Sequence, residues 1–229
     1  MASKKDGGSR GLHIRVKTAD KRSISSTRWL QRQLNDPFVA KARAAGYRSR
    51  AAFKIEEMDD KFHLFKPGAR VVDLGCAPGG WSQVAVKRVG KKGKVVGCDL
   101  LEVDAIPGAT LVVQDFLAED APDIMKGLLG GMADVVLSDM ASNTTGHTPT
   151  DHIRIMNLCE LAYEFALEVL TPGGAFVCKV LKGGTESALL KRMQKDFKTV
   201  KHAKPESSRK DSAESYVVAT GFKGQAPAN

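Results

Sequence analysis

The run Val-Val-Asp-Leu-Gly-Cys-Ala-Pro-Gly-Gly-Trp, from Val71 to Trp81, constrains the fold more than any other part of this 229-residue chain. A short β-branched stretch ends in an acidic residue and breaks into a glycine-rich turn, and an amphipathic stretch then continues to Val89. This order predicts a strand, a tight loop and the N-terminus of a helix. Open α/β sheets bind nucleotide-like ligands at such a place.

The sequence around this turn indicates which ligand it holds. A second predicted strand ends at Asp99, where a carboxylate is placed to accept hydrogen bonds from a pair of ribose hydroxyls. The chain has no Gly-x-x-x-x-Gly-Lys-Ser/Thr run for a triphosphate. The dinucleotide pattern also fails, because the glycines after Gly75 are Gly79 and Gly80. A turn with no phosphate to bind suits S-adenosylmethionine; the alternative is a tight turn in another α/β enzyme.

Strands and helices are predicted to alternate from residue 67 onward. Predicted strands cover 70–74, 95–99, 110–114, 134–138, 175–179, 197–201 and 215–220, and predicted helices cover 81–89, 120–129, 152–170 and 187–195. In the longest helix, Asp151 is the expected N-cap, and Ile153 and Leu161 belong to the expected apolar face. The alternation predicts a mostly parallel sheet with helices on both faces, closed by a hairpin-like pair of strands.

Positive charge is concentrated at the front of the chain. Residues 1–54 contain 14 Lys and Arg against three Asp and Glu, a net charge of +11, whereas the whole chain carries +9 and the remainder therefore about −2. We interpret 1–27 as a basic leader without regular structure. Residues 28–229 form a single domain, with a basic helical segment at 28–66 and the core at 67–223.

This basic segment predicts a nucleic-acid-binding surface, and a solvated tail is the alternative for the first 25 residues. Within it, helices are expected to begin after Asp36 and after Ser49. The candidate RNA contacts are Arg28, Arg32, Lys41, Arg43, Arg48 and Arg50.

The remaining composition excludes several classes of protein. No apolar run approaches the length that spans a membrane, and the histidines and cysteines show no metal-binding spacing. The four cysteines are expected to be reduced and buried, as in a cytoplasmic protein. We therefore expect a cytoplasmic monomer with no metal and no membrane partner.

Five motifs occur in the order of a known family. They span 48–54, 73–83, 138–141, 176–180 and 207–216. Together they resemble the FtsJ/RrmJ-type ribosomal RNA 2′-O-methyltransferases. The resemblance implies a Rossmann-like S-adenosylmethionine-dependent methyltransferase fold with seven strands, the last pair antiparallel. It also implies S-adenosylmethionine as methyl donor, and as acceptor a uridine ribose in the A loop of 23S rRNA in the large ribosomal subunit. Ser142 departs from the pattern, because the family commonly has proline there.

The resemblance also assigns a catalytic tetrad of Lys54, Asp139, Lys179 and Glu214. A lysine that accepts a proton must be neutral. Burial and a second lysine nearby would lower its pKa, whereas the two carboxylates would raise it. On this basis Lys179 is expected to be the base, with Lys54 lowering its pKa, Asp139 orienting it and Glu214 positioning the ribose. The alternative is a cationic Lys179 that orients the hydroxyl lone pair.

Cofactor contacts follow from the same match. Gly79 and Trp81 are expected at the methionine end, Asp99 at the ribose and Asp115 at the adenine amino group, although Trp81 could instead be a plain packing residue. The other expected cofactor residues are Asp73, Gly75, Pro78, Gly80 and Asp139.

Two other functions remain open from the sequence. The first is a 2′-O-methyltransferase that acts on tRNA or on another rRNA site. The second is a non-catalytic RNA-binding ribosome assembly factor that keeps the cofactor pocket.

Overall fold

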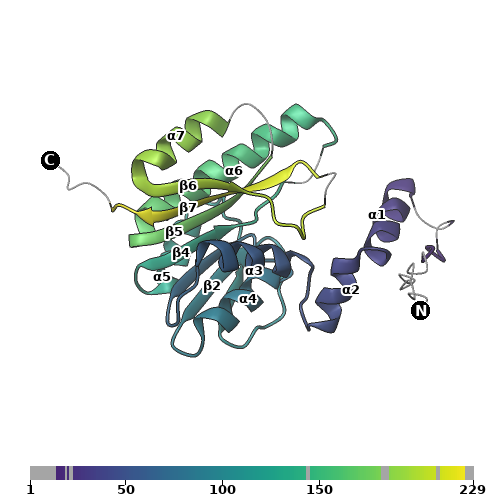
Figure 1. The fold of residues 1–229 in the computed structure, drawn as a ribbon, viewed down its shortest axis with the longest axis horizontal. Helices are drawn as coiled ribbons and strands as arrows, with labels where there is room; N and C mark the ends of the chain where they lie inside the picture. Colours follow the sequence, from purple (N-terminus) through teal and green to yellow (C-terminus); the bar gives the residue numbers. More distant parts are fainter. Residues whose placement is uncertain are drawn as a thin grey trace, which may run out of the picture.

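A seven-stranded sheet forms the centre of the molecule, with the strand order β3-β2-β1-β4-β5-β7-β6 (Figure 1). The computed structural model describes residues 14–18, 20, 23–142, 145–181, 186–209 and 212–224. The strands are β1 (Arg70–Leu74), β2 (Lys94–Asp99), β3 (Ala109–Val113), β4 (Ala133–Ser138), β5 (Leu170–Leu181), β6 (Phe197–Ala203) and β7 (Glu214–Phe222).

The first five strands are parallel, and β7 runs antiparallel to both β5 and β6. Leu74 pairs with Cys98 and with Ser138, and Ser138 pairs with Cys178. The carboxyl ends of β2, β1, β4 and β5 therefore meet at one edge. The predicted fold class is confirmed, including the antiparallel last pair.

Helices cover both faces of the sheet. The helices are α1 (Ile24–Leu34), α2 (Pro37–Ala44), α3 (Ala51–Phe62), α4 (Gly80–Val89), α5 (Ala121–Leu129), α6 (Thr148–Val169) and α7 (Glu186–Asp196). The apolar sides of α3 and α4 share one core cluster with the sheet, and those of α5, α6 and α7 share the other. This arrangement leaves the carboxyl edge of the strands uncovered by a helix layer.

The N-terminal arm, which we define as α1 and α2, stands off this three-layer body next to the carboxyl edge (Figure 1). Ser23 caps α1 by accepting a hydrogen bond from the Ser26 amide at 3.2 Å. Because α1 begins at Ile24, the end of the segment interpreted as a leader without regular structure (1–27) is helical. Asp36 caps α2 as predicted, accepting from the Phe38 amide at 3.0 Å. Most of the leader before α1 lies outside the described residues.

Two predicted helix caps are wrong. The N-cap of α6 is His147, and the Asp151 carboxylate, one turn into the helix, accepts hydrogen bonds from the amide and hydroxyl of Thr145, both at 2.7 Å. Ser49 does not cap α3, whose N-cap is Arg50 without a side-chain bond. In the part of the chain that the structure describes, the buried hydroxyl of Ser49 has no hydrogen-bond partner. Asp151 and Ser49 were both assigned as caps because each is a polar residue beside an apolar run. The actual cap depends on where the backbone becomes helical.

The apolar face predicted for α6 is also partly wrong, because Ile153 and Leu161 are exposed. A helix turns by about 100° per residue, which places these two residues away from the side that carries Cys159, Ala162 and Ala166. Those three are buried against the sheet.

The four cysteines are free and buried, as predicted. Within the described part of the chain, no helix combines the length and apolarity needed to cross a bilayer.

Candidate active site

The turn between β1 and α4 brings the backbone very close to the neighbouring loop. Gly75 has φ +77°, and a Cβ atom there would lie 2.8 Å from the Met140 Cα. Gly79, the N-cap of α4, has φ +104°. The amides of Gly75 and Cys76 donate to the Cys98 carbonyl at 2.9 and 3.1 Å. Only glycine tolerates this combination of positive φ and close contact at position 75, so the turn shape follows directly from the sequence.

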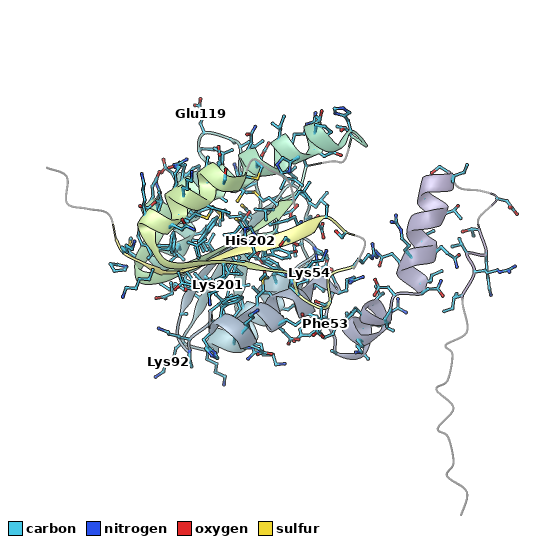
Figure 2. All side chains as sticks on the ribbon, turned by 45° about the horizontal axis from the view of Figure 1, so that its top comes forward. Phe53, Lys54, Lys92, Glu119, Lys201 and His202 are labelled. Carbon is cyan, nitrogen blue, oxygen red and sulfur yellow. The ribbon has the colours of Figure 1, made fainter. Side chains whose placement is uncertain are left out.

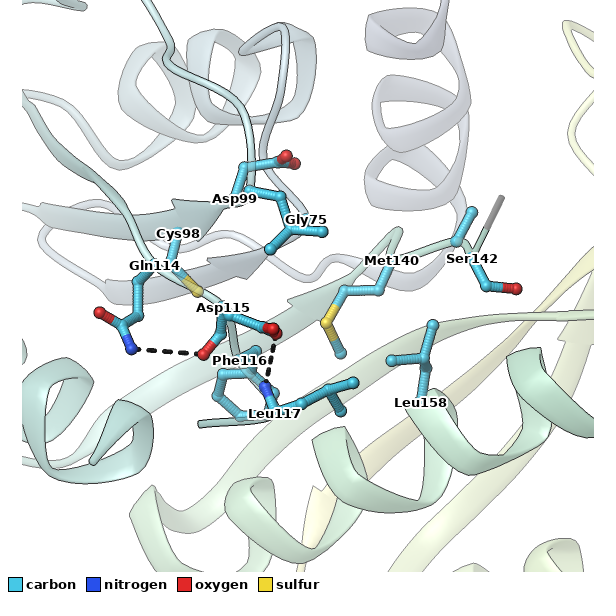
Figure 3. A pocket seen from close by; sticks show the side chains of 12 residues that line it. Gly75, Cys98, Asp99, Gln114, Asp115, Phe116, Leu117, Met140, Ser142 and Leu158 are labelled. Atoms are coloured by element: carbon cyan, nitrogen blue, oxygen red, sulfur yellow. Dashed lines mark hydrogen bonds between the residues drawn. The ribbon is translucent and has the colours of Figure 1, made fainter. Parts of the chain in front are cut away.

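A cavity of about 280 Å³ opens beside this turn (Figure 3). Three predicted cofactor residues, Gly75, Asp99 and Asp115, line it. Most of its wall was not predicted and is apolar, and Figure 3 shows these side chains surrounding one space. The other lining residues are Cys98, Leu100, Gln114, Phe116, Leu117, Met140, Ala141, Ser142 and Leu158.

The two carboxylates at the cavity are oriented by backbone amides. Asp99 accepts from the Ala77 amide at 2.9 Å through one oxygen and from the Leu101 amide at 3.0 Å through the other. Asp115 accepts from the Leu117 amide at 2.9 Å. Because each carboxylate oxygen has two lone pairs, both groups keep capacity to accept from a ligand.

Asp73 is fully buried behind the turn. One of its oxygens accepts from the Ser82 hydroxyl at 2.6 Å, and the other has no hydrogen-bond partner among the described residues. Burial raises the pKa of Asp73 to about 7, with a smaller contribution from Asp139 and Asp99. A buried acceptor without a partner is costly, and a cationic ligand group nearby would relieve it. The turn, the two rim carboxylates and Asp73 thus fit a cationic, adenosine-containing cofactor.

Three predicted cofactor residues lie against α3 and the loop before it, and none of them lines the cavity. The indole N–H of Trp81 donates to the Ala51 carbonyl at 2.9 Å. A Cβ on Gly80 would lie 2.5 Å from the Ser49 hydroxyl oxygen. The Pro78 carbonyl accepts from Arg48 at 3.4 Å. These contacts favour the packing alternative for Trp81.

The four tetrad residues come together at the carboxyl edge of the sheet. The Lys179 ammonium lies 2.9 Å from the Asp139 carboxylate and donates to the Asp139 carbonyl at 2.8 Å. The Lys54 ammonium lies 3.3 Å from the Glu214 carboxylate. Figure 2 shows Lys54 at the end of the core that faces the N-terminal arm, whereas Lys92 lies at the opposite end.

Tyr216 joins these two pairs. Its hydroxyl accepts from Lys54 at 3.0 Å and donates to Asp139 at 3.0 Å, so an unbroken chain of contacts runs from Glu214 to Lys179. Burial raises the pKa of Tyr216 well above its ordinary value, which keeps the phenol a donor. Sequence reasoning assigned Tyr216 no role. The spacing of Glu214 and Tyr216 could have indicated a role, because residues two apart in a strand lie on the same face of the sheet.

The pKa of Lys179 lies above its ordinary value, which contradicts the lowered pKa expected from the sequence. Burial lowers the pKa of Lys179, but the Asp139 and Glu214 carboxylates together outweigh burial. The carboxylates prevail because Asp139 touches the ammonium directly. Lys179 is therefore a cation at neutral pH.

The predicted RNA-contact residues fall into two groups. Arg32, Lys41 and Arg43 are exposed, and the side chain of Arg28 lies outside the described residues. Arg48 and Arg50 are instead engaged within the protein. The Arg48 guanidinium donates to the carbonyls of Asp104 at 2.6 Å and Ala105 at 2.9 Å, and Arg50 donates to Asp36 and to the Ser207 carbonyl.

The described residues contain no group of three or more histidine, cysteine or acidic side chains suited to a metal ion. The site consists of a cavity with carboxylates at its rim and, beside it, two buried lysines that are each paired with a carboxylate. Such an arrangement can hold a cationic cofactor and orient a hydroxyl group next to it.

Comparison with known proteins identifies close relatives. Residues 47–222 match the model of the FtsJ-like methyltransferase family. A protein named ribosomal RNA large subunit methyltransferase E, from Parvibaculum lavamentivorans, is 63% identical over 229 residues, covering 96% of this chain and 90% of that protein. One of the same name from Paramagnetospirillum magneticum is 64% identical over 223 residues, covering 95% and 91%.

Solved structures agree in fold. A candidate ribosomal RNA methyltransferase from Plasmodium falciparum superposes with a TM-score of 0.70 at 28% identity, covering 78% of this chain and 100% of that one. A candidate rRNA methylase from Clostridium thermocellum has a TM-score of 0.51 at 19% identity, covering 73% and 97%, and supports the fold alone.

Proposed function

The chain belongs to the FtsJ-like methyltransferase family, and we propose that it methylates a ribose 2′-hydroxyl of large-subunit ribosomal RNA with S-adenosylmethionine as the donor. The observation that carries this proposal is the contact chain Glu214–Lys54–Tyr216–Asp139–Lys179, which ends beside the cofactor cavity at Met140. Relatives named ribosomal RNA large subunit methyltransferase E support the substrate class. The finer target is the one expected from the sequence, a uridine in the A loop of 23S rRNA.

The cofactor cavity takes the donor. Asp99 would accept hydrogen bonds from the ribose hydroxyls and Asp115 from the adenine amino group, and backbone amides hold both carboxylates in place. The apolar wall formed by Leu117, Met140 and Leu158 would pack against the adenine. Gly79 does not line the cavity, so its contact with the methionine end remains a prediction. The Asp73 oxygen that has no hydrogen-bond partner among the described residues would favour a cationic group nearby.

When bound, S-adenosylmethionine supplies an electrophilic methyl group on a cationic sulfur. The chain must then align the acceptor oxygen and manage one proton. Because Lys179 is cationic, it would donate a hydrogen bond to one lone pair of the 2′-oxygen and leave the other lone pair available to the methyl group. Asp139 fixes the Lys179 ammonium from two sides, through its carboxylate and its carbonyl.

Proton removal needs no strong base in this arrangement. As the oxygen–methyl bond forms and the methyl–sulfur bond breaks, the hydroxyl would become far more acidic. Water or the Asp139 carboxylate would then suffice to take its proton, and the cofactor would leave as a neutral thioether. Alignment of the reacting atoms is then the main contribution of the site, which can amount to roughly 7–11 kcal/mol at best.

The test is transfer of labelled methyl groups to large ribosomal subunits and to purified 23S rRNA that lack the modification, followed by mapping of the labelled ribose. We expect a single labelled ribose in 23S rRNA. Label on tRNA and none on rRNA would contradict the proposed substrate. Tight cofactor binding with no label on any RNA would contradict the activity and favour an assembly factor.

A further inference from the structure

A second pocket, of about 320 Å³, lies between the N-terminal arm and the tetrad, on the side of Lys54 and Glu214. Its volume falls at the lower end of the range for small-ligand pockets. It is separate from the cofactor cavity, because the two share no lining residue. The pocket is lined by Arg32, Gln33, Arg50, Ala51, Lys54, Arg209, Ser212 and Glu214.

The pocket carries an excess of positive charge. Four cations and one carboxylate line it, and that carboxylate, Glu214, is paired with Lys54. Asp36 contacts both Arg50 and Arg209 and can neutralise only one of them. Arg32 forms no ion pair with any described residue. Two positive charges thus remain uncompensated in a space bordered by the tetrad.

Asp36 assembles this pocket from distant segments of the chain. Its side chain is 7% exposed and holds Arg50 from the start of α3 and Arg209 from the loop before β7. Arg209 approaches one Asp36 oxygen through two nitrogens, both at 3.4 Å, and its side chain is 31% exposed. A guanidinium has five N–H donors, so Arg209 keeps donors for a ligand.

The two arginines are also crowded. Burial lowers the pKa of Arg50, and the neighbouring Arg209 cation lowers it further. Holding two guanidinium groups on one carboxylate costs electrostatic free energy that an anion between them would recover. Crowding of this kind indicates a site that is complete only when an anion is bound.

We propose that this pocket binds the phosphodiester on the 3′ side of the acceptor ribose, with Arg209 and Arg32 as its ligands. The inference rests on the proposed function. In RNA, the 3′-phosphate is attached to the carbon next to the one that bears the 2′-hydroxyl. Lys54 belongs to both the pocket and the tetrad, so a hydroxyl at the tetrad places its own 3′-phosphate at the pocket.

The charges decide where in the pocket the phosphate lies. Glu214 would repel it, so the phosphate occupies the end formed by Arg32 and Arg209, and Lys54 and Glu214 contact the ribose. Arginine suits this role because its planar guanidinium binds two phosphate oxygens at once. Gln33 and Ser212 add neutral polar groups beside the same end.

The experiment combines protein and RNA changes. Once the methylated ribose has been mapped, synthetic RNA hairpins containing it are made with one phosphate at a time replaced by a neutral methylphosphonate. Wild type, Arg209→Gln, Arg32→Gln and Arg209→Lys are compared for RNA affinity and for KM. Lys198→Gln is the matched control. Lys198 is exposed at the start of β6, which pairs with the end of β7 that lies away from Glu214.

We expect the neutral linkage 3′ of the acceptor ribose to weaken wild-type binding roughly tenfold to a hundredfold, and to weaken Arg209→Gln hardly at all. Each glutamine variant should also lower the slope of log affinity against log salt by about 0.7. Arg209→Lys should be intermediate, because it keeps the charge and loses the two-pronged contact. Lys198→Gln should behave as wild type, and cofactor affinity should be unchanged throughout.

The assignment would be overturned if the neutral linkage weakened RNA binding equally in wild type and in Arg209→Gln. It would also be overturned if KM and the salt dependence of RNA affinity were unchanged in both glutamine variants. Failure of the proposed function looks different, because wild type itself would then methylate no hairpin. Cofactor affinity and thermal melting of each variant separate a lost contact from a misfolded protein.

Discussion

The two halves of the active site are built in different ways. The cofactor half consists mainly of backbone: a turn with glycines at positive φ, and strand ends whose carboxylates are held by amides two or more residues away. The acceptor half consists of side chains from α1, α3, the residue after β4, β5, the loop before β7 and β7 itself, which meet through Asp36 and Tyr216. A local stretch of sequence encodes the first half, whereas the second half exists only after distant segments have packed.

This difference predicts how each half responds to change. Substitutions in the cofactor half should alter affinity for the donor, since its groups are fixed by the main chain. Substitutions in the acceptor half should alter rate and RNA binding, since each of its side chains is positioned by another one.

The largest effect is expected for Lys179→Met. Removing the cation that orients the acceptor hydroxyl should lower the single-turnover rate at least about a hundredfold, with cofactor affinity unchanged. The raised pKa of Lys179 also predicts that the wild-type rate is flat through neutral pH and falls only once the lysine loses its proton at high pH. A rate that rises tenfold per pH unit through neutrality would show instead that neutral Lys179 is the base.

Tyr216→Phe should lower kcat roughly tenfold or somewhat more, because both Lys54 and Asp139 lose a hydrogen-bond partner while the ring still packs on Trp81. Tyr163→Phe is the matched control. Tyr163 is equally buried and donates to Asp196, remote from the tetrad. Steady-state kinetics and melting curves on both variants distinguish positioning from stability. Equal kcat in the two would remove Tyr216 from the catalytic arrangement.

Asp99→Asn should weaken cofactor binding about tenfold and leave RNA binding unchanged. The amide retains one acceptor oxygen for the Ala77 or Leu101 amide but loses the charge that strengthens bonds to ribose hydroxyls. Asp104→Asn, an exposed carboxylate in the following loop, serves as the control in calorimetry. Unchanged affinity in Asp99→Asn would place the ribose elsewhere.

The last prediction concerns stability instead of activity and depends on pH. The pKa of Asp73 is about 7 in the folded protein and near 3.9 in an unfolded chain. Between these values the folded protein holds a proton that the unfolded chain has released. The free energy of unfolding therefore falls as pH rises through this window, by roughly a few kcal/mol at most. Asp73→Asn should lack this fall.

Melting of the cofactor-free protein from about pH 5 to about pH 8 checks this prediction, because wild type should lose stability relative to Asp73→Asn across that range. Asp123→Asn, at an exposed position on α5, should follow wild type. Parallel curves for wild type and Asp73→Asn would mean that Asp73 is already compensated without a ligand.

The sequence by itself determined the sheet, its strand ends and the cofactor turn. Periodicity and glycine spacing act over a few residues, so the turn at Gly75 and the strand-end carboxylate of Asp99 could be placed without the fold. Asp115 was assigned through resemblance to a family. The Lys54–Asp139–Lys179–Glu214 set was also found, but through resemblance to a family and not through spacing. Helix caps were less predictable, as Asp151 and Ser49 show, because a cap depends on the backbone direction of the residues around it.

Only the tertiary structure decided the electrostatics and the acceptor side. The pKa of Lys179 depends on two carboxylates, Asp139 directly after β4 and Glu214 at the start of β7. No local pattern specifies that folding brings them close to Lys179. Arg48 and Arg50 were likewise predicted from the sequence to contact RNA. In the structure Arg48 binds a backbone carbonyl and Arg50 binds Asp36. Arg209, which was not predicted, lines the second pocket and contacts Asp36. Long charged side chains can be solvated or can bind other groups of the protein. Which of the two occurs depends on the groups that folding brings within reach.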